Sequence, residues 1–143
     1  MILNEILNEI LNEMTQGEVS YMQRELNSIY KPIGIKFVIT KHVMDRVNNI
    51  DGREKTVSPE EIISTFKKIY NQHGSKFEDF YKSGKLNETI KFVIHDRDSN
   101  LNIPVAYEID KITHSPVLVL LTVMKKEISK FGSKGYGVFE ITV

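Results

Sequence analysis

Apolar residues follow two different periods along the chain. Up to about residue 82 they recur at intervals of three and four residues, which is the spacing of an amphipathic helix. From Thr89 onward they alternate with polar residues or form short continuous runs, which is typical of β-strands. The predicted helices cover residues 19–30, 41–48, 59–73 and about 77–81, and a short strand, residues 35–40, lies among them. The predicted later strands cover residues 90–94, 103–109, 117–124 and 137–143.

Short polar links join the first three of the later strands, and such links favour antiparallel neighbours. The run from Val117 to Leu121 is apolar at every position, so this strand should be covered on both faces and lie inside the sheet. The sequence therefore predicts an α+β fold, with N-terminal helices followed by a four-stranded antiparallel sheet.

Local signals mark the start and end of the longest predicted helix. Ser58 is expected at the N-cap, Pro59 at the first helical position, and Glu61 completes a capping box. The pair His73-Gly74 is expected to end this helix. Thr40 is expected to cap the helix over residues 41–48.

The first residues repeat the unit Ile-Leu-Asn-Glu three times over residues 2–13. A step of four residues advances about 400° around a helix, so the isoleucines form one row and the leucines a neighbouring row. This helix either packs on its own domain or serves in docking or self-association, and its acidic face argues against binding to a membrane surface. We expect residues 1–16 to be an N-terminal amphipathic helix and a candidate docking element, and residues 17–143 to be a single α+β domain.

The length, composition and motifs of the sequence exclude several classes of site. A length of 143 residues suits one core, and the absence of cysteine excludes disulfides, thiolate zinc sites and a cysteine nucleophile. The longest apolar run is far short of a membrane span, so no membrane association is expected. The four histidines are scattered and no P-loop, GxGxxG or GxSxG motif occurs, so neither a metal nor another cofactor is expected.

One pair of residues carries candidate chemistry. His42 and Arg46 are four residues apart on a predicted helix, so they share one side of it. An imidazole takes up a proton near neutral pH, and a guanidinium holds a phosphate through two hydrogen bonds. Such a pair suits metal-independent RNA cleavage, in which a base removes the 2′-hydroxyl proton and a cation stabilises the phosphorane. The alternative is a histidine on a helix surface and an arginine in a salt bridge.

The stretch His42-Val-Met-Asp-Arg46-Val-Asn, followed by Val57-Ser-Pro-Glu-Glu-Ile62, resembles a core shared by a family of tailed-phage proteins. Asn102-Ile-Pro-Val-Ala106 and Leu121-Thr-Val-Met-Lys-Lys126 are similar to that family's sheet segments. The resemblance covers about residues 35–126 and points to the barnase–EndoU–colicin–RelE-like superfamily of metal-independent ribonucleases, with RegB-type endoribonucleases closest in character. It implies a RelE/RegB-like fold, with helices first and then a four-stranded antiparallel sheet.

The resemblance also implies roles for single residues. His42 matches the first catalytic histidine, Arg46 is its paired arginine, and Lys67 stands where the family has its second catalytic histidine. A lysine stabilises charge but is a poor general base, and the other residues that could supply the missing group are His95, Lys125 and Lys126. The further candidates for binding RNA phosphates are Lys125, Lys126 and Arg53.

Two functions remain open. The first is a metal-independent endoribonuclease acting on host or viral RNA, with 2′,3′-cyclic phosphate products and a place in the host cytoplasm. The second is a catalytically inactive protein, associated with the virion or with a host factor, that uses residues 2–13 for assembly. A third, weaker possibility is a small modulator of a host enzyme.

Overall fold

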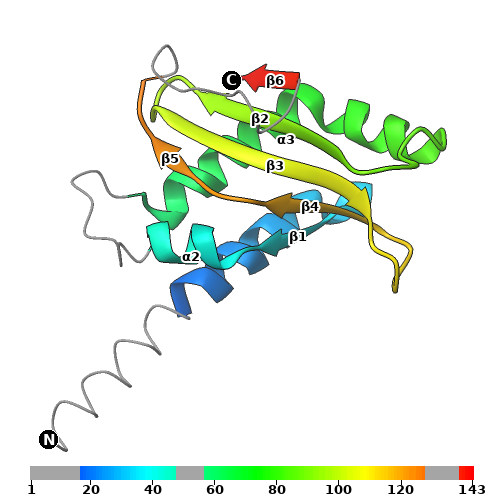
Figure 1. The fold of residues 1–143 in the computed structure, drawn as a ribbon, viewed down its shortest axis with the longest axis horizontal. Coiled ribbons are helices and arrows are strands. Elements are labelled where there is room, and N and C mark those ends of the chain that lie inside the picture. The colour runs from blue at the N-terminus through cyan, green and yellow to red at the C-terminus, as the bar shows by residue number, and fades with distance from the viewer. Residues whose placement is uncertain (1–16, 48–56, 128–138) are drawn as a thin grey trace, which may run out of the picture.

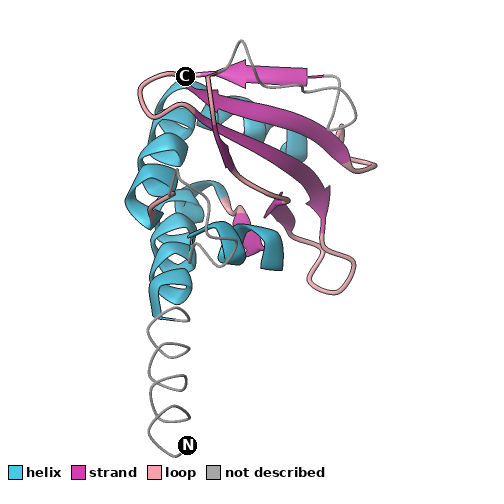
Figure 2. Cartoon of the chain, turned by 60° about the vertical axis from the view of Figure 1, so that its left-hand side comes forward, coloured by secondary structure: helices cyan, strands magenta, loops and turns pink. Residues whose placement is uncertain are grey.

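The computed structural model describes residues 17–47, 57–127 and 139–143 of the chain (Figure 1). The described chain forms two layers, with helices packed on one face of a β-sheet (Figure 2). The helical elements are a helix over residues 17–30, the 3-10 turn η1 (Lys31–Ile33), α2 (Lys41–Val47) and α3 (Pro59–Lys82). The strands are β1 (Lys36–Ile39), β2 (Ile90–Asp96), β3 (Leu101–Ile109), β4 (Pro116–Leu120), β5 (Met124–Lys125) and β6 (Phe139–Thr142).

The sheet is mixed. Its strand order is β1-β4-β3-β2-β6, and the short β5 pairs with β3. The pairs β2–β3 and β3–β4 are antiparallel, but β1 pairs with β4 in parallel and β6 pairs with β2 in parallel. The α+β class is therefore confirmed, but the sheet is not four antiparallel strands: the strand predicted over residues 137–143 corresponds to β6, which pairs in parallel with β2. Parallel pairing is possible at both edges because long stretches of chain separate β1 from β4 and β2 from β6.

β4 lies between β1 and β3, as the apolar run from Val117 to Leu121 predicts. The predicted strand over residues 117–124 is divided, however, because residues 121–123 separate β4 from β5. This interruption shapes the site described below.

Aromatic side chains form the centre of the core between the helices and the sheet. Tyr30, Phe37 and Phe66 are fully buried and meet edge to face, with ring centroids 4.8 Å apart for Tyr30–Phe37 and 5.0 Å for Phe37–Phe66. The hydroxyl of Tyr30 donates a hydrogen bond to the Phe66 carbonyl at 2.8 Å, which ties the helix over residues 17–30 to α3. Burial raises the pKa of Tyr30 far above its usual range, so the phenol remains a donor.

α3 starts where the sequence predicts and ends later. The Glu61 N–H donates to Ser58 Oγ at 3.2 Å and the Ser58 N–H donates to Glu61 Oε1 at 3.2 Å, so both halves of the capping box are present. The helix then continues through Gly74 to Lys82, and the separate helix expected around Phe77 is its last part. A Cβ at Gly74 would lie 3.4 Å from the Tyr70 ring. That distance is an ordinary van der Waals contact, so the helix has room for a side chain at position 74, and Gly74 does not end it.

Two predicted features lie outside the described residues. They are the amphipathic repeat within residues 1–16, and Arg53 in the segment 48–56. Of the helices that are described, none is both long enough and apolar enough to cross a membrane.

Candidate functional site

Buried polar side chains gather at one end of the sheet. Among the described residues, the buried polar or charged side chains are those of Arg46, Thr65, His95, Asp96 and Asn102. Each residue contacts the segment 123–126 directly or through one further residue. We call segment 123–126 and these five side chains the β5 corner; Figure 1 shows it beside α2 and the first turns of α3. A connected buried polar network is harder to stabilise than an apolar core, so it marks a candidate functional site.

A β-bulge opens the backbone at the β5 corner. The register of β3 changes by one residue between β4 and β5, so residues 121–123 face only Ile103 and Pro104. The Leu121 N–H donates to the Pro104 carbonyl at 3.0 Å. In an extended strand the N–H and C=O of one residue point to the same side, so the N–H that Pro104 lacks would also face the bulge. The bulge therefore allows a proline within an inner strand.

Two side chains fix α2 to this bulge. The Thr40 hydroxyl lies 2.8 Å from the Leu120 carbonyl and 2.9 Å from the Leu121 carbonyl. Arg46, only 8% exposed, donates from Nε to the Val123 carbonyl at 3.0 Å. The Thr40 side chain thus binds the end of β4, whereas the sequence predicts that it caps α2.

His95 and Asn102 connect β5 with β6. Asn102 Nδ2 donates to the Lys126 carbonyl at 2.8 Å, and it also lies 3.4 Å from the Met124 carbonyl. This orientation turns Asn102 Oδ1 toward His95 Nδ1, 2.6 Å away, so Nδ1 carries the proton of that hydrogen bond. His95 Nε2 lies 3.0 Å from Oε1 of Glu140 on β6. Both ring nitrogens of His95 are therefore engaged.

Asp96, which follows His95 on β2, lies on the opposite face of the sheet from His95 and binds α3. Its carboxylate accepts hydrogen bonds from Thr65 Oγ1 at 2.8 Å and from Lys68 Nζ at 3.0 Å, and Lys68 also reaches Asp98 at 2.9 Å. Burial alone would raise the pKa of Asp96, but the bonds from Lys68 and Thr65 outweigh burial and lower it. The hydrogen bonds to Asp98 and Asp96 raise the pKa of Lys68. The pair is charged at neutral pH.

An ion pair links β5 to the start of α3. Lys125 Nζ donates to Glu61 Oε2 at 2.7 Å, while the other carboxylate oxygen of Glu61 completes the capping box. Thr65 Oγ1, which donates to Asp96, also lies 2.9 Å from the Glu61 carbonyl, and this contact connects the ion pair to Asp96. The N-terminus of α3 is therefore part of the same network.

The structure brings together three of the predicted site residues. Arg46, His95 and Lys125 all belong to the β5 corner, and each is held by the partners given above. Lys126, with an exposed side chain, follows Lys125 directly in the chain and is the last residue of segment 123–126. These four residues come from three separate places in the sequence, so their convergence is a result of the fold.

His42 and Lys67 differ from these residues because both are exposed. His42 lies one helical turn before Arg46 on α2, but its ring makes no hydrogen bond or ion pair within the described part of the chain. Lys67, beside Lys68 on α3, likewise has no such contact among the residues described. His42 and Arg46 thus lie one turn apart on α2 as expected, but the imidazole is exposed and the arginine is buried.

Sequence reasoning missed four residues that build the β5 corner. Thr65, Lys68, Asp96 and Asn102 were not predicted as site residues. Asp96 does begin a polar turn, and its Oδ1 accepts the Asp98 N–H at 3.0 Å, so its turn role was visible in the sequence. Its second role needs Thr65 and Lys68, about 30 residues earlier in the chain, and no local signal indicates that contact.

No group of three or more histidine, aspartate or glutamate side chains arranged to hold a metal ion occurs among the described residues. Comparisons with models of protein families, with curated proteins and with solved structures found no match to the chain. A function must therefore be inferred from the geometry of the β5 corner.

Proposed function

We propose that the chain binds RNA at the β5 corner and acts as a metal-independent endoribonuclease there. The observation that carries this proposal is the convergence of Arg46, His95 and Lys125 around segment 123–126, which includes the exposed Lys126, with the exposed His42 one helical turn before Arg46 on α2. Cationic and imidazole groups around one segment suit the binding and cleavage of a phosphodiester.

The held and the exposed residues have different roles in this proposal. Arg46, His95 and Lys125 position α2, β3 and α3 around segment 123–126, because their hydrogen bonds join these elements. His42 is the general base and Lys126 is a cation for the phosphate, because both side chains are exposed. His42 takes the proton from the 2′-hydroxyl, the 2′-oxygen bonds to phosphorus, and the bond from phosphorus to the 5′-oxygen breaks. Water donates a proton to the leaving 5′-oxygen and takes one back from the His42 imidazolium, which restores the neutral base and gives a 2′,3′-cyclic phosphate and a 5′-hydroxyl end.

A binding protein without catalysis is the second candidate. It is favoured by the fact that Arg46 Nε and Lys125 Nζ are already bound to protein groups. In that case the β5 corner is a structural junction, and the chain acts in the virion or on a host factor through another surface.

A cleavage assay in EDTA separates the two candidates. Purified protein is incubated with total RNA, and the product ends are analysed for cyclic phosphate. The first candidate predicts cleavage that His42→Ala abolishes with no change in thermal unfolding, while Lys91→Ala, an exposed lysine on β2, retains full activity. Intact RNA with the folded wild-type chain would contradict the ribonuclease proposal and leave the second candidate.

A further inference from the structure

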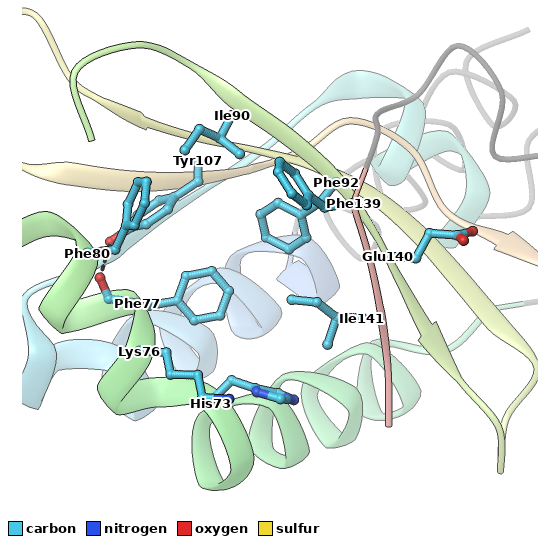
Figure 3. Close-up of a pocket in the computed structure, with 10 residues that line it drawn as sticks. All are labelled: His73, Lys76, Phe77, Phe80, Ile90, Phe92, Tyr107, Phe139, Glu140 and Ile141. Carbon is cyan, nitrogen blue, oxygen red and sulfur yellow. Dashed lines mark hydrogen bonds between the residues drawn. The ribbon is translucent and has the colours of Figure 1, made fainter. Parts of the chain in front are cut away.

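A second site lies between the C-terminal half of α3 and the β6 edge of the sheet. It is a pocket of about 340 Å³, which Figure 3 shows with its lining side chains. The described residues that line it are largely aromatic or aliphatic and include Phe77, Phe80, Phe92, Tyr107, Phe139 and Ile141. Phe139 is 59% exposed, which is unusual for a large apolar side chain on a strand. We call this hollow the α3–β6 pocket.

Basic groups border the α3–β6 pocket on one side. His73 and Lys76 line it from α3 and lie three residues apart, so they share one side of the helix. Neither side chain makes a hydrogen bond or an ion pair within the described ranges. Glu140 also lines the pocket, but its Oε1 lies 3.0 Å from His95 Nε2, and Figure 3 shows its side chain directed away from the aromatic rings. The pocket therefore suits an apolar segment that carries acidic groups along one side.

We propose that the α3–β6 pocket binds the Ile-Leu-Asn-Glu repeat, residues 2–13, of a second copy of the chain. In a helix, the row of Ile2, Ile6 and Ile10 has the leucine row on one side and the row of Glu5, Glu9 and Glu13 on the other. Isoleucine and leucine side chains fill the aromatic pocket, and the glutamates face Lys76 and His73. The apolar pattern and the charge of the repeat thus both match the pocket. This proposal does not depend on the RNA site.

The position of the repeat in the chain favours a second copy over the same copy. Figures 1 and 2 place the start of the helix over residues 17–30 and strand β6 at opposite ends of the described chain. Only residues 14–16 join the repeat to that helix, and three extended residues span about 11 Å at most. Exchange between two copies places the repeat of each in the pocket of the other, which is an interface with twofold symmetry.

The test measures self-association of the full chain by sedimentation velocity over a range of concentrations. The wild type is expected to form dimers. Lys76→Glu, or replacement of Glu5, Glu9 and Glu13 by lysine, is expected to weaken dimerisation at least tenfold, and the combination of both changes is expected to restore it. Lys91→Glu makes the same charge change on the opposite face of the sheet and is expected to have no effect. Phe139→Ser is expected to weaken dimerisation with little loss of folding stability, because the ring is mostly exposed.

Two results would overturn the proposal. One is a wild type that stays monomeric at all concentrations, together with no binding of a labelled peptide of residues 1–16 by fluorescence anisotropy. The other is a dimer whose affinity is the same in Lys76→Glu and Phe139→Ser as in the control variant Lys91→Glu. Circular dichroism of each variant shows whether a loss of association comes from a loss of fold.

Discussion

The N-terminal half of α3 contacts the sheet through charged and hydroxyl groups as well as through apolar side chains such as Phe66, while its C-terminal half contacts the same sheet mainly through aromatic rings. Glu61, Thr65 and Lys68 bind Lys125 and Asp96 in the first half. In the second half, the Phe77 ring lies 5.7 Å from that of Phe92 and 5.3 Å from that of Tyr107. One helix therefore joins a polar corner, fixed by directional bonds, to an apolar pocket with an exposed aromatic edge.

The difference between the two ends matters for function. Hydrogen bonds and ion pairs fix the positions of the groups that make them, so the β5 corner is suited to place polar groups around a reacting phosphate. Aromatic contacts are less directional, so the α3–β6 pocket is suited to bind a side chain or a helix face. Substitutions at the two ends should accordingly differ in how much folding stability they remove.

The largest effect is expected for Lys68→Met. This change leaves the buried Asp96 carboxylate without its cationic partner, and it should lower the free energy of unfolding by about 2–3 kcal/mol, given that the lysine is partly exposed. Lys67→Met removes an exposed lysine next to it and should change the free energy of unfolding by less than about 0.5 kcal/mol. Urea unfolding of both variants measures the difference. Equal losses would mean that the pair with Asp96 contributes nothing particular to the fold.

The pH dependence of the same variant tests the cause. The folded-state pKa of Asp96 is lowered, so its contribution to stability is present above the unfolded value of about 3.9 and is lost as pH falls through the folded value. The pKa of Lys68 is raised, so its contribution is present below the unfolded value of about 10.4 and is lost as pH rises through the folded value. The stability difference between wild type and Lys68→Met should therefore be constant from about pH 5 to pH 9 and shrink in more acidic solution. A difference that persists unchanged at pH 2 would indicate lost packing instead of a lost ion pair.

The contacts of α3 and the sheet also show how much of the fold can be predicted from the sequence alone. The capping box of Ser58 and Glu61, the central position of β4 and the antiparallel order of β2, β3 and β4 follow from neighbouring residues, and all three are present in the structure. The parallel edges, the length of α3 and the contact of Asp96 with Thr65 and Lys68 depend on residues far apart in the chain. They were not predicted, because spacing within one segment carries no information on distant partners.

The candidate site shows the same limit on a smaller scale. The spacing of His42 and Arg46 correctly places both on one helix, but it does not show that Arg46 is buried and bound to the Val123 carbonyl at the bulge. Val123 is far from α2 in the chain, and the bulge that precedes it lies opposite Pro104 on another strand. Spacing within one helix therefore does not show which member of an i, i+4 pair is buried.

Arg46→Met should have an intermediate effect. The substitution keeps most of the buried stem but removes the hydrogen bond to the Val123 carbonyl, so the free energy of unfolding should fall by about 1–2 kcal/mol. Under conditions where the variant is fully folded, its affinity for RNA should fall less than that of Lys126→Met. Urea unfolding and a filter-binding assay with a short RNA measure the two quantities. A variant that folds normally but no longer binds RNA would make Arg46 a direct phosphate ligand.

The smallest effect is expected for Tyr107→Phe, at the pocket end of α3. The Tyr107 hydroxyl donates to the Phe77 carbonyl at 2.9 Å, and burial raises the pKa of Tyr107 above its usual range, so the group is a neutral donor. That carbonyl also accepts a bond within the helix, so loss of the hydroxyl leaves no buried acceptor unpaired, and the free energy of unfolding should fall by only about 1 kcal/mol. Thermal unfolding measures this change, and dimerisation should be unaffected because the ring still lines the pocket. A loss as large as that of Lys68→Met would show that the pocket end, too, depends on directional bonds, and the contrast between the two halves of α3 would not hold.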